Sequence, residues 1–141
     1  MKHRDPTQQL LKAYINLLSG HIVYDGEEIT IGTRIPRNKT KYVYLYIQAT
    51  TPNNTGDKVI YSIDVAFQVV SIQDVNEGDE TPVNSIIDQI LQMASEENSI
   101  PMTGFKCVMN SFLGMDHQTE LTDSSYNIIK TLTMSHFIEQ L

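Results

Sequence analysis

The sequence predicts an α+β domain in which two helices pack on one face of a mostly antiparallel β-sheet. Three observations support this prediction: two long strand-like runs joined by a turn, two segments with apolar residues at helical spacing, and two further strand-like runs near the C-terminus. The expected order is a helix, three or four strands, a second helix and two final strands. The 141 residues are enough for a single domain, 1–141, with a sizeable core.

The two long strands are the basis of this prediction. Residues 42–50 and 59–70 are rich in β-branched and aromatic side chains, which suit a pleated, half-buried surface. Apolar and polar residues alternate in the second run, so we expect one of its faces to be buried. That face consists of Tyr61, Ile63, Val65, Phe67 and Val69. The first run is apolar or aromatic on both faces, which predicts cover on both sides. The turn residues at 51–57 predict an antiparallel pair.

Two amphipathic segments predict the helices. Asp5-Pro6 and Thr81-Pro82 each place a capping side chain before a proline that suits the first helical position. Apolar residues follow the first signal at helical spacing as far as Gly20, which favours a helix end. The second apolar face extends from Val83 to Ala94, and the polar residues 96–99 end that helix. Both apolar faces are expected to pack on the sheet.

The segment between the first helix and the first long strand contains the candidate functional residues. Residues 21–24 predict a short strand, Asp25-Gly26 predicts a turn, and residues 28–32 predict a strand that pairs back. Residues 33–41 follow and predict an exposed loop with a central proline. This loop carries four cations, which are Arg34, Arg37, Lys39 and Lys41. Function often resides in such loops on a rigid scaffold, and we interpret these residues as a subunit or partner interface. The alternative is a solvated loop without a partner.

The C-terminal part of the chain predicts the last two strands. Residues 105–113 read as a strand, and the polar residues 114–125 read as a loop. Residues 126–138 alternate and predict a long final strand that is broken or turned near His136.

The net charge of −7 is divided unevenly between the two parts of the chain. Residues 1–60 contain eight cations and five acids, a balance of +3, whereas residues 61–141 contain two cations and twelve acids, a balance of −10. An acidic chain is a poor general binder of nucleic acid, because phosphate contacts need cations. The asymmetry favours a basic edge that meets an acidic surface, such as that of another copy. The alternative is an acidic half that only aids solubility.

The sequence contains no recognisable catalytic, cofactor-binding or metal-binding motif. It has no glycine-rich phosphate loop, and its four histidines lack metal-ligand spacing, so we predict no enzyme activity, cofactor or metal. Asp116 and His117 are adjacent, but side chains at neighbouring positions diverge on an extended segment. The acidic residues 77–80 fit a solvated turn better than a calcium loop, and Cys107 reads as a buried small hydrophobe. The tyrosines of residues 42–46 could stack on single-stranded nucleic acid, although core or subunit packing fits an acidic chain better.

No apolar run is long enough to span a membrane, and residues 1–6 lack the apolar segment of a signal peptide. The single cysteine fits a reducing compartment.

The order of these elements resembles a known family. Val23-Tyr24-Asp25-Gly26, then Ile35-Pro36, then Tyr42-Val43-Tyr44-Leu45 are similar to a stretch of the bacteriophage tail-terminator and tail-completion proteins, also called tail-to-head joining proteins. The opening helix, the second amphipathic helix and a last strand preceded by Asp123-Ser-Ser-Tyr126 match in order. Val43 stands where proline is common in the family. The resemblance covers nearly the whole chain.

The resemblance implies a structural virion protein with no catalytic role. Such a subunit assembles into a ring, often a hexamer, at the head-proximal end of a phage tail. It caps the tail tube and presents a surface to the head connector. DNA would pass through the lumen only as cargo, and the location would be the virion tail or neck after assembly in the host cytoplasm. Another neck or head-closure component remains an alternative, as does a soluble binding module that uses residues 34–41 to hold an anionic partner.

Overall fold

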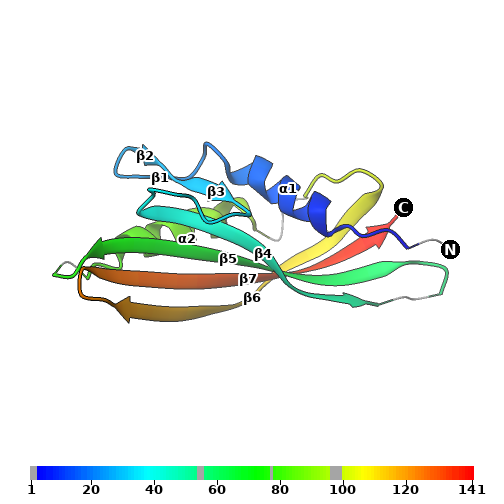
Figure 1. Ribbon diagram of the computed structural model, residues 1–141. Helices are drawn as coiled ribbons and strands as arrows, with labels where there is room; N and C mark the ends of the chain where they lie inside the picture. The colour runs from blue at the N-terminus through cyan, green and yellow to red at the C-terminus, as the bar shows by residue number, and fades with distance from the viewer. Residues whose placement is uncertain (1–2, 54–55, 77, 96–99) are drawn as a thin grey trace.

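The computed structural model describes residues 3–53, 56–76, 78–95 and 100–141 and shows an α+β fold (Figure 1). Two helices and seven strands lie in the described residues. In chain order they are α1 (Thr7–Leu18), β1 (Val23–Tyr24), β2 (Glu27–Glu28), β3 (Thr30–Gly32), β4 (Lys41–Pro52), β5 (Ile60–Asp74), α2 (Thr81–Met93), β6 (Phe105–Leu121) and β7 (Ser125–Gln140).

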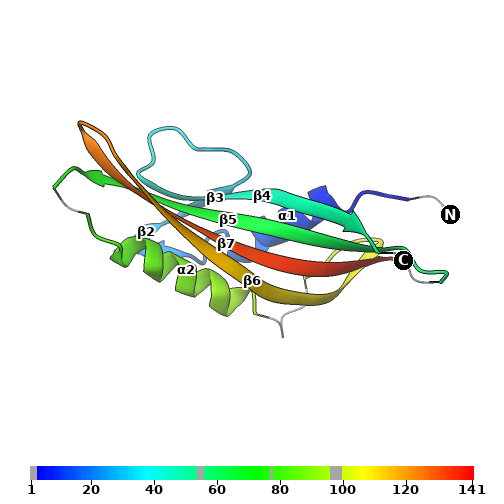
Figure 2. The ribbon, with the colours of Figure 1, turned by 90° about the horizontal axis from the view of Figure 1, so that it is seen from below.

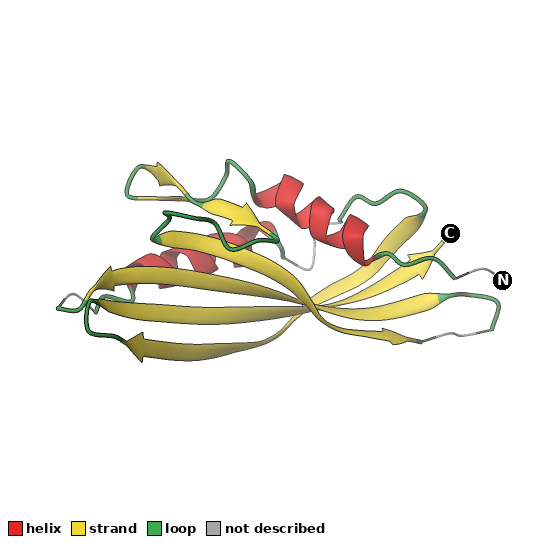
Figure 3. Cartoon of the chain, viewed as in Figure 1, coloured by secondary structure: helices red, strands yellow, loops and turns green. Residues whose placement is uncertain are grey.

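A five-stranded sheet forms the body of the molecule, as Figure 3 shows. Its strand order is β3-β4-β5-β7-β6, and every neighbouring pair is antiparallel except β3 with β4. The side chains that contact the helices share one face: Phe67 of β5 packs on Tyr14 of α1, and Lys130 of β7 binds Asn84 of α2. Both helices therefore pack on the same face, as predicted, and Figure 2 shows α2 lying beside the sheet.

The core lies between this face of the sheet and the two helices. The predicted buried face of β5 is confirmed: Tyr61 is 9% exposed, and Ile63, Val65, Phe67 and Val69 are fully buried. The opposite face has no helix over it. Tyr44 and Tyr46 are only half-buried there, with ring centroids 5.3 Å apart. The prediction that the first long strand is covered on both sides is therefore wrong for these two tyrosines.

The helix starts differ in detail from the capping prediction. Helix α1 begins at Thr7, and the Oδ1 atom of Asp5 accepts a hydrogen bond of 2.9 Å from the Thr7 N–H. Helix α2 begins at Thr81 itself, with Glu80 at the N-cap, and the Oδ1 atom of Asp79 accepts a hydrogen bond of 3.0 Å from the Thr81 N–H. A carboxylate near a helix N-terminus satisfies a backbone donor and complements the helix dipole. The predicted end of α2 at residues 96–99 lies outside the described residues.

The N-terminal strands pair differently from the prediction. Residues 27–28 do pair back on Val23 and Tyr24, through a turn at Asp25 and Gly26 with positive φ at both positions. Residues 30–32 do not pair with them: they form β3, which pairs in parallel with β4. Two parallel strands cannot be joined by a tight turn, so no turn signal marks this pairing, although β4 is the next strand in the chain.

Two predictions about the C-terminal strands are wrong. Residues 114–121 are not a loop, because β6 continues through them and pairs with β7 as far as Leu121. Strand β7 is also unbroken at His136. That histidine is buried, and its Nδ1 lies 3.0 Å from the carbonyl oxygen of Ile63, while its Nε2 lies 2.5 Å from the Tyr14 hydroxyl. Both ring nitrogens thus have partners, so the strand holds a polar side chain in the core without a break.

Candidate functional site

The predicted functional loop, which we call the basic loop, comprises residues 33–41. Strands β3 and β4 are parallel, and Gly32 at the end of β3 lies level with Tyr44. The chain must therefore travel back past this level before it enters β4 at Lys41. Figure 2 shows this return as a wide arch away from the sheet. Asn38 has a φ of 60°, a left-handed conformation that asparagine tolerates better than most residues.

The cations of the basic loop face solvent. Arg34, Arg37 and Lys39 are exposed, and Lys41 is half-buried at the first position of β4. In the part of the chain that the structure describes, the ion pairs join Lys58 to Glu139 and His117 to Glu80, so none involves this loop. The structure thus confirms an exposed loop and leaves its four charges available to another molecule.

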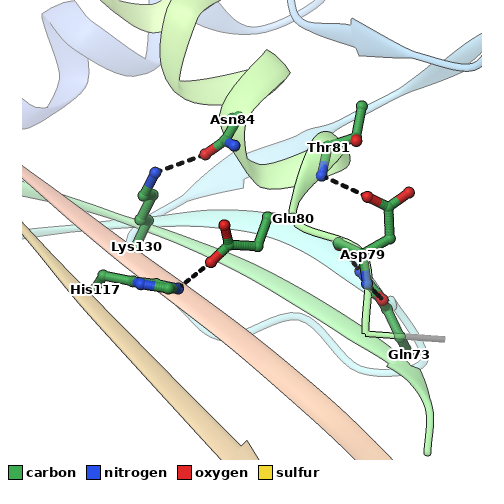
Figure 4. Close-up of polar contacts among 7 residues, drawn as sticks. All are labelled: Gln73, Asp79, Glu80, Thr81, Asn84, His117 and Lys130. Carbon is green, nitrogen blue, oxygen red and sulfur yellow. Dashed lines mark hydrogen bonds and ion pairs between the residues drawn. The ribbon is translucent and has the colours of Figure 1, made fainter. Parts of the chain in front are cut away.

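A set of polar contacts ties the end of the β6–β7 hairpin to the start of α2, as Figure 4 shows. The Lys130 Nζ donates to the Asn84 Oδ1 over 2.6 Å, and the His117 Nε2 lies 2.6 Å from the Glu80 carboxylate. Because these bonds join three elements, they hold the far part of the hairpin against the helix. His117 and Asp116 lie on opposite faces of β6, so they do not form an acid–base pair.

Hydrogen bonds of two side chains, Gln73 and Asp79, fix the loop before α2. The side chain of Gln73 bonds to both the N–H and the carbonyl oxygen of Asp79. Hydrogen bonds from Thr81, chiefly from its backbone N–H, lower the pKa of the Asp79 carboxyl below its usual value. Among the described residues, no group of three or more histidine, cysteine, aspartate or glutamate side chains is placed to hold a metal.

Two side chains of reactive residue types, Cys107 and His136, are held in their neutral forms by burial. Burial raises the pKa of the Cys107 thiol to about 11, so at neutral pH the thiol is protonated and a poor nucleophile. Cys107 is half-buried rather than fully buried as predicted. Burial lowers the pKa of His136, which keeps the imidazole neutral in the core.

Sequence reasoning missed an exposed group of large apolar side chains on β6, the last strand at one edge of the sheet. We call this group the apolar edge patch, and it consists of Val108, Met109, Phe112, Leu113 and Met115. Apolar residues in a strand-like run are normally read as core. Only the strand order, which places β6 at an edge, shows that these side chains lack cover.

No protein-family model matches this chain, and no curated protein matches it in sequence. Within the described residues, no helix has both the length and the apolar character needed to cross a membrane.

Proposed function

We propose that this chain is a ring-forming structural protein of a phage virion, a tail terminator or tail-completion protein that caps the tail tube and joins it to the head connector. The resemblance of the sequence to that family supports the proposal. The structural observation that carries it is the basic loop, whose cations have no ion-pair partner in the described part of the chain. Exposed charges of this kind steer and align a partner with the opposite charge.

The partners follow from this role. The chain would bind other copies of itself in a ring, the tail-tube protein on one side and the head connector or another neck protein on the other. DNA would be cargo, because a net charge of −7 does not favour retention of phosphates. The protein would reside in the tail or neck of the virion.

The same exposed cations support a second candidate function, that of a soluble module which binds an anionic partner through Arg34, Arg37, Lys39 and Lys41. A different neck or head-closure component is a third candidate, which shares the assembly role of the first. The mass of the protein in solution separates the assembly roles from the binding module. A ring component forms a multimer alone or with its tail-tube partner, whereas a binding module stays monomeric or dimeric in both conditions.

The test is analytical ultracentrifugation of the 16.0 kDa chain with and without tail-tube protein. We expect a multimer that loosens as salt rises, because exposed charges are screened. A monomer or dimer under both conditions would overturn the proposal. Tail and portal genes beside the coding sequence would support a virion role, and their absence would count against it.

A further inference from the structure

The apolar edge patch breaks the usual rule for edge strands. Exposed edges are normally short, charged or covered, because an exposed apolar edge invites association. Strand β6 is 17 residues long, and its patch residues are 39–59% exposed. The register places Phe112 and Met115 on the helix-bearing face and Met109 on the opposite face, so the patch extends around the outer edge of β6. Large exposed apolar side chains grouped on one strand mark an interaction surface.

Two bulges shape this patch. The pairing of β6 with β7 shifts register between Cys107 and Met109 and again between Phe112 and Gly114. Val108 and Leu113 are therefore the extra residues of the two bulges, and they are the most exposed members of the patch, at 56% and 59%. A bulge interrupts the regular row of backbone hydrogen-bonding groups that an added strand would need, and it changes the direction of a side chain. The patch is thus suited to side-chain packing against a partner rather than to extension of the sheet.

Acidic side chains lie next to the patch at the hairpin end. Asp116, Glu120 and Asp123, which we call the acidic tip, are all exposed. Within the described residues, none of the three takes part in an ion pair. The β6 edge therefore runs from an apolar surface to an acidic one.

The opposite edge of the sheet carries the complementary groups at the same level. The register across the sheet joins Lys41 to Ser71, Ser71 to Ile128, and Ile128 to Thr119. The basic loop is thus level with the acidic tip. In the same way, the register places Gly114 level with Tyr46.

Apolar groups on the β4 side complete the match. Tyr44 and Tyr46 are half-buried on the face without helices, which Met109 of the patch shares. Ile35 of the basic loop is 63% exposed. Strand β3 pairs only with residues 42–44 of β4, so the rest of β4 has no strand on its outer side among the described residues. From the level of Gly114 to the level of Thr119, the β6 edge changes from apolar to acidic side chains. Over the same levels, the β4 edge changes from the aromatic Tyr46 to the basic loop.

We propose that the apolar edge patch and acidic tip of one subunit bind the β4 edge and basic loop of a second copy. Strands β4 and β6 run in opposite directions within one subunit, so two copies placed side by side in the same orientation bring these edges together with matched polarity. This contact joins two different surfaces and therefore propagates into a ring or a filament. A two-fold contact between two β6 strands would leave the basic loop without its acidic partner. The inference rests on the self-association proposed above and names its interface.

Charge reversal tests the pairing of the two edges. One variant reverses the tip (Asp116→Lys with Glu120→Lys), and another reverses the loop (Arg34→Glu with Arg37→Glu). Each places like charges across the contact, so we expect self-association to weaken by roughly tenfold or more. An equimolar mixture of the two variants should form multimers again, because every tip then faces a loop of opposite charge. The control for the tip variant, Asp25→Lys with Glu27→Lys, makes the same charge change on the exposed β1–β2 ribbon and should assemble like the wild type.

A second pair of variants tests the apolar contribution. Phe112→Ser with Leu113→Ser should weaken assembly without lowering the melting temperature of the subunit, because both side chains are exposed. Val23→Ser with Val75→Ser, which are 44% and 40% exposed elsewhere, serve as the control and should leave assembly unchanged.

The outcomes separate the interface from the proposed function. Wild-type multimers that persist unchanged in the tip, loop and patch variants would overturn this interface and leave the ring role standing. Failure of the mixture to assemble would overturn the tip–loop pairing. A wild-type protein that is monomeric both alone and with the tail-tube protein would overturn the interface and the ring role together.

Discussion

Replacing Phe67 with alanine tests the central packing of the fold. The Phe67 side chain is fully buried in the middle of β5, and its ring packs edge-on against Tyr14 of α1, with centroids 4.9 Å apart and planes at 88°. Emptying a core aromatic site costs about 3–5 kcal/mol, and an edge-to-face aromatic pair contributes about 0.5–1.5 kcal/mol beyond its buried area. We therefore expect Phe67→Ala to lower the free energy of unfolding by an amount in the upper part of the 3–5 kcal/mol range, about 4–5 kcal/mol. For a chain of this length the melting temperature should fall by roughly 10–15 °C.

Urea unfolding followed by circular dichroism measures the loss, with wild type and variant at one protein concentration because assembly also stabilises the folded state. Phe137→Ala is the matched control. Phe137 is a half-buried residue on the opposite face of the same sheet, so its loss should be clearly smaller. A near-neutral Phe67→Ala variant, or equal losses for the two variants, would show that the core has been assigned to the wrong face.

Three further predictions concern local features. The pKa of His136 is lowered by burial, so the unfolded chain takes up its proton first as the pH falls. The contribution of His136 to the free energy of unfolding should be fully present above about pH 6.5 and should decrease below it, by up to about 1.4 kcal/mol per pH unit. Urea titrations at pH 7.5 and 5.5 measure this decrease, and His136→Gln should lack it. Cysteine at Ile90, a fully buried residue of α2, should react with a thiol reagent far more slowly than cysteine at the exposed Lys12 of α1. Equal rates would contradict the two-layer packing. Asp79→Ala should lower the melting temperature at neutral pH, but not at a pH low enough to protonate the carboxyl, because the group that accepts from the Thr81 N–H is a carboxylate. A pH-independent effect would exclude this explanation.

The parts of the fold that the sequence predicts well are those with one buried face. The residues of β5 that meet the helices, Tyr61 to Val69 at every second position, are all buried, although Ala66 on the other side is buried as well. The same reasoning predicts the apolar faces of α1 and α2, whose buried residues include Leu11 and Ile87. Local periodicity reports burial directly, so it succeeds wherever burial is one-sided.

The failures occur where burial is absent or where pairing is distant. Residues 116–121 of β6 are all exposed, so no alternation marks them, and the two bulges disturb the period further. The parallel pairing of β3 with β4 depends on a loop that returns the chain, which local patterns do not encode. The positive charges of the basic loop were visible in the sequence. The apolar edge patch was not, because Phe112 and Leu113 resemble core residues until the strand order is known.

The most direct test of the account is a cross-link between the two edges of neighbouring subunits. With Cys107 replaced by serine, cysteines are introduced at Thr40 in the basic loop and at Thr119 near the acidic tip, both exposed positions. A short bis-maleimide reagent should link the double variant into a ladder of covalent multimers, whereas either single variant should remain uncoupled, because each edge meets the opposite edge of its neighbour. Dimers from the Thr119→Cys variant alone would indicate a two-fold β6 contact. An unlinked double variant at concentrations where the protein is multimeric would show that these edges do not meet.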